Sequence, residues 1–158
     1  MSDRQVAATS FHWIFPEVRN AKTAAVLKDN GLLVLLWNTP PQPSYEAFQS
    51  LKGVYRDYAP ELAKYETHQN YYQNLSQIGQ GVIESGYFKD LTTQQLITKV
   101  TYSIDDYLTL LSTLSPYIRL ESEQRQTLFA ELKRVLKLNF SNNLDLDYLS
   151  LLQIAHKI

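Results

Sequence analysis

The residues of this chain best suited to chemistry lie in two short segments near its beginning. His12 and Trp13 belong to the first segment, residues 10–17. Asn38 ends the second segment, residues 30–38, where it directly follows an apolar run. An imidazole can act as a general base near neutral pH, and an amide can hold a substrate hydroxyl. The alternative interpretation is structural: Trp13 packs, His12 only hydrogen-bonds the loop, and Asn38 caps the backbone that follows it.

The elements that must position these residues are predicted by the pattern around them. Residues 5–10 are small and β-prone, which indicates a short strand or the end of one. Pro16 suits the first turn of a helix, and Asn30-Gly31 is typical of the helix end. The apolar run at 32–37 indicates a strand covered on both faces. Together these elements form a β-α-β unit of a doubly wound sheet, in which ligands bind outside the carboxyl ends of the strands.

The rest of the chain predicts short helices and strands. In chain order they are a helix capped by Ser44, a helical piece at 61–66, strands at 88–91 and 95–102, a helix capped by Ser103 or Asp105, a helix capped by Ser122, and a long strand at 144–156 with apolar residues at even positions. Residues 69–77 show no clear period, and Gly79-Gln80-Gly81 has the composition of a flexible connector.

These segments, in this order, resemble a class I S-adenosylmethionine-dependent methyltransferase of the small-molecule type 11 kind. Residues 11–13, Phe-His-Trp, are similar to the loop after the fourth strand of that family. Residues 26–32 are similar to the turn before the fifth strand, and residues 35–39 to the tip of that strand. Residues 107–115 are similar to the segment after the sixth strand, and residues 144–157 stand where the seventh, antiparallel strand belongs.

The resemblance implies an α/β fold, a partial Rossmann-like methyltransferase fold with flanking helices. Its mixed sheet would contain strands four, five, seven and six, with the seventh antiparallel between its neighbours. Residues 1–158 would be a single domain, the carboxyl-terminal part of that fold, with a lid and substrate region at about 39–86. The implied activity is methylation of a small molecule with S-adenosylmethionine as cofactor. The residues that would face cofactor or substrate are His12, Trp13, Asn38, Thr39 and Tyr45.

The family's cofactor motif is absent from this sequence. That motif is a Gly-rich turn after the first strand, where bare backbone approaches the ligand. The chain has five glycines, and Gly79-Gln80-Gly81, its one G-x-G, follows no predicted strand. We therefore expect a truncated methyltransferase that is inactive as this chain alone. Two alternatives remain open: one half of a split methyltransferase, whose partner chain supplies the glycine loop, and a non-catalytic oligomeric binding or assembly module.

A partial fold of this kind leaves one sheet edge unpaired, where the first strand of the whole fold would lie. An unpaired edge with an apolar flank promotes association. The resemblance therefore also predicts a homodimer through the exposed sheet edge.

Composition excludes several other classes of function. A net charge of -1, with scattered basic residues, gives no basis for binding nucleic acid or an anionic membrane. The three histidines, His12, His68 and His156, show no metal-ligand spacing, and no G-x-S-x-G elbow is present. The longest apolar run is too short to span a bilayer. Cysteine is absent, which is compatible with the cytoplasmic location that we expect.

Overall fold

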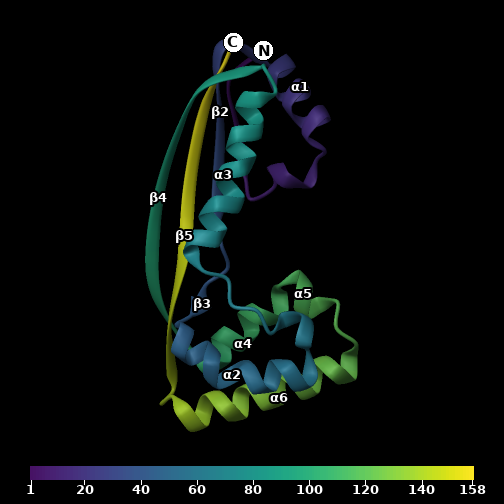
Figure 1. Cartoon of the computed structure of the whole chain (residues 1–158), viewed down its shortest axis with the longest axis vertical. Helices are drawn as coiled ribbons and strands as arrows, with labels where there is room; N and C mark the ends of the chain where they lie inside the picture. Colours follow the sequence, from purple (N-terminus) through teal and green to yellow (C-terminus); the bar gives the residue numbers. More distant parts are fainter. The chain divides into compact units, whose positions relative to one another are not determined.

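The computed structural model describes all 158 residues (Figure 1). Its strands are β1 (Ser2–Ala8), β2 (Leu27–Asn38), β3 (Gln42–Pro43), β4 (Phe88–Ser103) and β5 (Asn143–Lys157). Its α-helices are α1 (Pro16–Val26), α2 (Tyr45–Tyr58), α3 (His68–Glu84), α4 (Ile104–Thr113), α5 (Ser115–Ile118) and α6 (Ser122–Asn139). Two short 3₁₀ helices are η1 (Phe11–Trp13) and η2 (Pro60–Leu62).

These elements form two compact units. The first, the sheet unit, comprises residues 1–40, 67–98 and 148–158, and the second, the helical unit, comprises residues 41–66 and 99–147. The long strands β4 and β5 contribute residues to both units. Each unit has its own core of buried apolar side chains.

The sheet unit confirms the predicted mixed sheet. β1 pairs in parallel with β2, β2 pairs in antiparallel with β5, and β4 pairs with the other edge of β5. The order β1-β2-β5-β4 is the one predicted for strands four, five, seven and six. Val34 lies at the centre, with Val6 as its partner on β1 and Ile154 as its partner on β5.

Helices cover one face of this sheet in the sheet unit. Leu33, Leu35 and Trp37 of β2 are buried in one core with apolar side chains of α1 and α3. The alternate residues of β2 point to the other face, and Leu36 there is 42% exposed. The prediction that this strand is covered on both faces is therefore wrong for the sheet unit.

The connection between α1 and β2 also differs from the prediction. The helix ends at Val26 and β2 begins at Leu27, so Asn30-Gly31 lies inside a strand. Asn30 has a φ of 59°, and a Cβ added at Gly31 would lie 2.8 Å from the carbonyl oxygen of Lys28. The pair therefore forms a local irregularity where the β1–β2 register shifts, rather than a helix end.

The structure forms helix α3 where the sequence showed no clear period. Its N-cap is Thr67, whose side-chain oxygen accepts a hydrogen bond from the backbone nitrogen of Asn70. Gly79 lies inside this helix, and a Cβ added there would lie 2.4 Å from Nε2 of Gln153 on β5. The connector predicted at Gly79-Gln80-Gly81 is therefore a wrong interpretation, because Gly79 allows the helix to approach the sheet.

The helical unit confirms two of the predicted caps. Ser44 accepts a hydrogen bond from the backbone nitrogen of Ala47, and Ser103 accepts one from that of Asp106. Ser122, in contrast, is the first residue of α6 and not its cap. The helical piece predicted at 61–66 is only the 3₁₀ turn η2, and the two strands predicted between 88 and 102 are one strand, β4.

The long final strand is confirmed, but its buried positions change along its length. Leu144 and Leu146 are buried in the helical-unit core, whereas Leu151 and Ala155 are buried in the sheet-unit core. The buried positions thus change from even to odd numbers. One strand serves two cores, which an uninterrupted alternation cannot predict.

Candidate functional site

The candidate site lies at the carboxyl ends of β1 and β2. Because these strands are parallel, their carboxyl ends meet at one edge of the sheet. Thr9 follows β1 with a φ of 46°, and its backbone nitrogen donates to the carbonyl oxygen of Leu36 at 2.8 Å. This bond fixes the start of the loop that contains η1 against the end of β2.

Three aromatic rings gather at this edge. The ring centroid of His12 lies 5.0 Å from that of Trp13 and 5.6 Å from that of Trp37. Trp37 is buried, whereas Trp13 is 72% exposed. The cluster therefore has a fixed inner ring and an outer indole face that is open to a flat ligand, with an exposed imidazole between them.

A buried arginine on α1 holds the loop in place. Nη1 of Arg19 donates to the carbonyl oxygens of Phe11 at 3.2 Å and Ile14 at 3.4 Å. The guanidinium carbon also lies 4.7 Å from the ring centroid of Phe11. Burial lowers the pKa of Arg19, and the nearby charge of Glu17 opposes that shift. The sequence analysis did not single out Arg19. Its one visible signal was its position two residues after Glu17, the acidic residue in the first turn of α1.

The inner ring is fixed by a polar chain through the core. Nε1 of Trp37 donates to Oε1 of Gln153 at 2.9 Å, and Nε2 of Gln153 donates to the carbonyl oxygen of Leu75 at 3.2 Å. Gln153 is 1% exposed, so these bonds satisfy its amide in the core. Sequence reasoning missed Gln153 as well, because its partners lie on α3 and β2.

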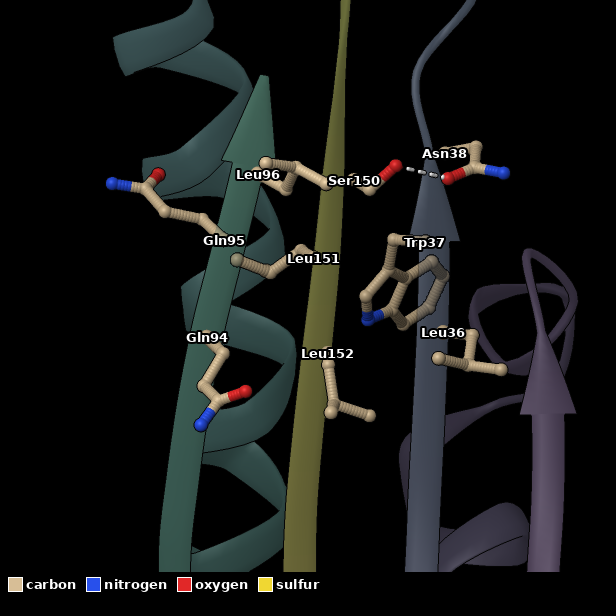
Figure 2. Close-up of a pocket in the computed structure, with 9 residues that line it drawn as sticks. All are labelled: Leu36, Trp37, Asn38, Gln94, Gln95, Leu96, Ser150, Leu151 and Leu152. Atoms are coloured by element: carbon tan, nitrogen blue, oxygen red, sulfur yellow. Dashed lines mark hydrogen bonds between the residues drawn. The ribbon is translucent and has the colours of Figure 1, made fainter. Parts of the chain in front are cut away.

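Asn38 and Thr39 take different positions at the end of β2. Oδ1 of Asn38 accepts a hydrogen bond from the hydroxyl of Ser150 at 2.7 Å, and Figure 2 shows the amide nitrogen on the side away from Ser150. Thr39 is buried; its Oγ1 accepts from the backbone nitrogen of Leu149, and its own nitrogen donates to that residue's carbonyl oxygen. Thr39 thus ties β2 to β5, while Asn38 keeps a polar group at the surface.

A shallow recess of about 380 Å³ lies beside Asn38 on the sheet (Figure 2). It is lined by residues of β2, β4 and β5, namely Leu36, Trp37, Asn38, Gln94, Gln95, Leu96, Ser150, Leu151 and Leu152. Its polar groups come from amide and hydroxyl side chains, and none of the lining residues is charged.

The fifth candidate, Tyr45, belongs to the helical unit. It is the first residue of α2, is 59% exposed, and packs edge-on against Tyr65 with ring centroids 5.3 Å apart. The other four candidates, His12, Trp13, Asn38 and Thr39, lie in the sheet unit.

The residues present fit S-adenosylmethionine only in part. The exposed rings and the amide could contact a nucleoside, but no glycine turn stands at this edge of the sheet. Gly53 lies in α2, Gly79 and Gly81 lie in α3, and Gly86 precedes β4. No group of three or more His, Asp or Glu side chains is placed to hold a metal ion. None of the helices combines the length and apolar character that crossing a bilayer requires.

Comparison with known proteins supports the fold. No protein-family model matches the sequence, and no curated protein matches it. Among solved structures, a protein of Anaeromyxobacter dehalogenans assigned to the type II methyltransferases superposes with a TM-score of 0.59 at 18% identity. The match covers 96% of this chain and 63% of that protein.

Two further solved structures are more distant. A protein assigned to an antibiotic biosynthesis pathway of Anabaena variabilis as a methyltransferase gives a TM-score of 0.49 at 10% identity, covering 94% of this chain and 65% of that one. A protein of Bacillus halodurans assigned as a methyltransferase gives 0.42 at 15% identity, covering 98% and 69%.

The fold is therefore part of the class I methyltransferase fold, as the sequence resemblance implies. The chain spans less than two thirds of the length of the Anaeromyxobacter protein.

Proposed function

We propose that this chain is the carboxyl-terminal part of an S-adenosylmethionine-dependent methyltransferase that methylates a small molecule. The observation that carries the proposal is the edge where β1 and β2 end together. There His12 lies against Trp37, and Asn38, the last residue of β2, bonds Ser150 of β5. That edge belongs to a sheet with the strand order of the methyltransferase fold. Ligands of open α/β sheets bind at such an edge.

In this proposal each candidate residue has a separate task. His12 serves as general base if the acceptor must lose a proton, and Trp13 offers its exposed indole face to a flat ligand. Asn38 holds a polar group of the acceptor, and Thr39 fixes the end of β2 against β5. In this proposal residues 1–158 are a single domain, and Tyr45 belongs to its lid, residues 39–86. Positioning of two reactants is the main source of rate in such a site.

The glycine turn that grips the cofactor must come from further polypeptide, because this chain offers none at the edge. In one form of the proposal that polypeptide belongs to the same protein, of which this chain is a truncated piece. In the other form it is a partner chain, and this chain is one half of a split enzyme. A cytoplasmic location, compatible with the absence of cysteine, and a homodimer through the β1 edge are parts of the same proposal.

A non-catalytic assembly module is the second candidate. The observation that favours it is the incomplete fit of the edge to S-adenosylmethionine. A module of this kind would use the exposed sheet and the helical unit for binding only, and it would have no need of His12.

The deciding experiment reads the coding DNA in front of this chain and then measures ligand binding. A strand followed by a Gly-rich turn, in frame or in a separate gene, is expected. The polypeptide that carries the turn, produced with this chain, is then titrated with S-adenosylhomocysteine in a calorimeter. Micromolar binding by the pair, with no heat from this chain alone, is the expected result. A pair that binds nothing, or the lack of any such coding sequence, would favour the assembly module.

A further inference from the structure

A second recess lies in the helical layer of the sheet unit, where α1 meets the carboxyl-terminal end of α3. Its volume of about 480 Å³ is within the range of small-molecule sites. The residues that line this α1–α3 recess are Pro16, Glu17, Asn20, Gly81, Glu84, Ser85 and Tyr87. Both of its walls are helices of this chain, and none of its residues lines the recess beside Asn38.

The α1–α3 recess contains a buried amide oxygen that lacks a hydrogen-bond donor. Asn20 of α1 is 3% exposed, and its Nδ2 donates to the carbonyl oxygen of Gly81 on α3 at 3.4 Å. Its Oδ1 is buried and accepts no hydrogen bond. The opposite amide orientation would set Oδ1 against the carbonyl oxygen of Gly81, so the bond identifies the oxygen as the unpartnered atom. A buried acceptor without a donor is costly, and here it lines a recess, which indicates a ligand that donates.

The charged groups that line the α1–α3 recess are both negative. Glu17 and Glu84 are exposed, and neither forms an ion pair. Arg19 senses the charge of Glu17, but its guanidinium is buried and donates to the carbonyl oxygens of the η1 loop. Helix α3 ends at the recess with no basic residue in its last turn, so the negative end of its dipole adds to the two carboxylates. The recess therefore favours a positively charged ligand.

We propose that the α1–α3 recess binds a small organic cation, the protonated form of a primary amine. An ammonium group carries three N–H donors, which match the amide oxygen of Asn20 and the carboxylates of Glu17 and Glu84. Hydrogen bonds from a charged donor are stronger than those between neutral groups. Tyr87 is 46% exposed, so its ring offers an aromatic face to the cation and to its alkyl carbons. The inference does not depend on methyl transfer.

Other occupants suit the α1–α3 recess less well. A metal ion would fill a small part of its volume, and no group of three or more His, Asp or Glu side chains is placed to hold one. An anion would be repelled by both carboxylates and by the end of α3. A single water molecule could donate to Asn20, but it would make no use of the two negative charges. The occupant that uses the amide oxygen, the carboxylates and the exposed ring is an organic cation.

The test titrates the isotope-labelled full chain at neutral pH and follows its amide signals by nuclear magnetic resonance. The probes are n-butylamine, 1-butanol, which carries a hydroxyl in place of the ammonium group, and magnesium chloride. Glu17→Gln and Glu84→Gln each remove one carboxylate of the recess. The control is Glu123→Gln, because Glu123 is also exposed and in the first turn of a helix, α6, but belongs to the helical unit. Circular dichroism checks that the variants are equally folded.

The amine is expected to shift the side-chain amide signals of Asn20 and the backbone amides of residues 81–87, with a dissociation constant of about 1 mM or below. The alcohol should shift neither set. Glu17→Gln and Glu84→Gln should each raise the dissociation constant roughly fivefold, because each removes a charged acceptor, and Glu123→Gln should leave it unchanged. No shifts with the amine, equal shifts with the alcohol, or binding that both recess variants leave unaltered would overturn the proposal. Tighter binding of Mg²⁺ at the same signals would also overturn it, because the recess would then be a metal site.

Discussion

At the scale of single residues, Arg19 decides the shape of the candidate loop. Its guanidinium holds the carbonyl oxygens of Phe11 and Ile14 from inside the sheet unit. Arg19→Met keeps the length of the side chain and removes both donors. We expect a loss of about 1–2 kcal/mol in the free energy of unfolding, because two carbonyl groups lose their hydrogen-bond donor. The loss is limited because the substitution also removes Nε, which is buried without a hydrogen-bond partner. Urea unfolding followed by tryptophan fluorescence measures it.

Lys22 gives the matched control for this substitution. It lies on the same helix, α1, and its side chain is exposed. Lys22→Met is expected to change the free energy of unfolding by less than about 0.5 kcal/mol. Equal stability of Arg19→Met and Lys22→Met would contradict the anchoring role.

His12 carries the prediction that separates catalysis from packing. Its ring is exposed, so His12→Ala should change the free energy of unfolding by less than about 0.5 kcal/mol. In the enzyme completed by its cofactor-binding polypeptide, the same substitution should lower turnover by roughly 10²–10⁴ if His12 is the base. Binding of S-adenosylhomocysteine should stay the same. Unchanged turnover would contradict a catalytic role for His12 and would leave it only a packing role against the rings of Trp13 and Trp37.

Sequence reasoning located the surface residues of the site better than the buried ones. The β-α-β pattern was enough to place His12 and Asn38 at the end of parallel strands, because that geometry depends on local periodicity. Arg19 and Gln153 were missed because their roles depend on partners in other elements. A buried arginine or glutamine looks like any polar residue until the fold supplies the carbonyl groups that it binds.

At the scale of elements, the two glycines of α3 differ in what a methyl group would meet. A Cβ at Gly79 would lie 2.4 Å from Nε2 of Gln153, whereas a Cβ at Gly81 would meet nothing within 4 Å. Gly79→Ala must displace an amide that bonds Trp37 and Leu75, so we expect it to lower the free energy of unfolding by about 1–3 kcal/mol. Gly81→Ala should instead raise it by up to about 1 kcal/mol, because alanine favours the helix.

Chemical denaturation of the two glycine variants, compared with the unchanged chain, measures this difference. Opposite signs are the expected result. If both substitutions stabilise the protein equally, the side chain of Gln153 moves freely, and the close approach of α3 to β5 does not depend on Gly79.

A second prediction for elements concerns the buried tyrosines of the helical unit. The hydroxyls of Tyr55 on α2 and Tyr117 on α5 lie 2.8 Å apart. Burial raises the pKa of Tyr55 well above its ordinary value, and burial likewise raises the pKa of Tyr107 on α4. The hydroxyls of Tyr55 and Tyr107 therefore stay protonated in the folded protein at a pH where they ionise in the unfolded chain.

The sign of the pH dependence follows from these raised pKa values. Above about pH 10 the unfolded state binds fewer protons than the folded state, so stability falls as the pH rises, by up to about 1.4 kcal/mol per pH unit for each tyrosine. Below that pH the contribution is fully present. Urea unfolding between pH 8 and 11 is expected to show the fall, and Tyr107→Phe is expected to reduce its slope. An identical slope in that variant would contradict the buried, protonated state of Tyr107.

Elements with local signals were predicted well, and elements that depend on distant contacts were not. Ser44 and Ser103 cap helices as predicted, since a cap is formed with residues three positions away. α3 was missed because its exposed face is polar and its glycine suggests a loop, while its stability comes from packing on β5. The end of α1 was displaced by four residues because a local turn signal, Asn30-Gly31, is used inside a strand.

At the scale of the whole molecule, the two separate cores predict that the backbone amides of the two units are protected from hydrogen exchange to different degrees. The helical-unit core contains Leu128, Leu132 and Leu136 of α6, each fully buried, and the sheet-unit core has none of them.

The sequence predicted the order of the sheet, because the strand pattern follows the methyltransferase resemblance. It did not reveal the division of β4 and β5 between two cores, since a strand pattern carries no signal for where one core ends and another begins.

Leu132→Ala tests whether the two units open independently. Removing this side chain should cost about 2–5 kcal/mol in the helical unit, because it leaves a cavity in a tightly packed core. Hydrogen exchange should then accelerate at the amides of α2 and α6, while the amides of Leu33 and Leu35 in β2 keep their protection. Leu138→Ala, on the same helix but 73% exposed in the unchanged chain, should alter neither set. If the amides of β2 lose protection together with those of α6, the two cores unfold as one cooperative structure, and the long strands β4 and β5 transmit the loss between them.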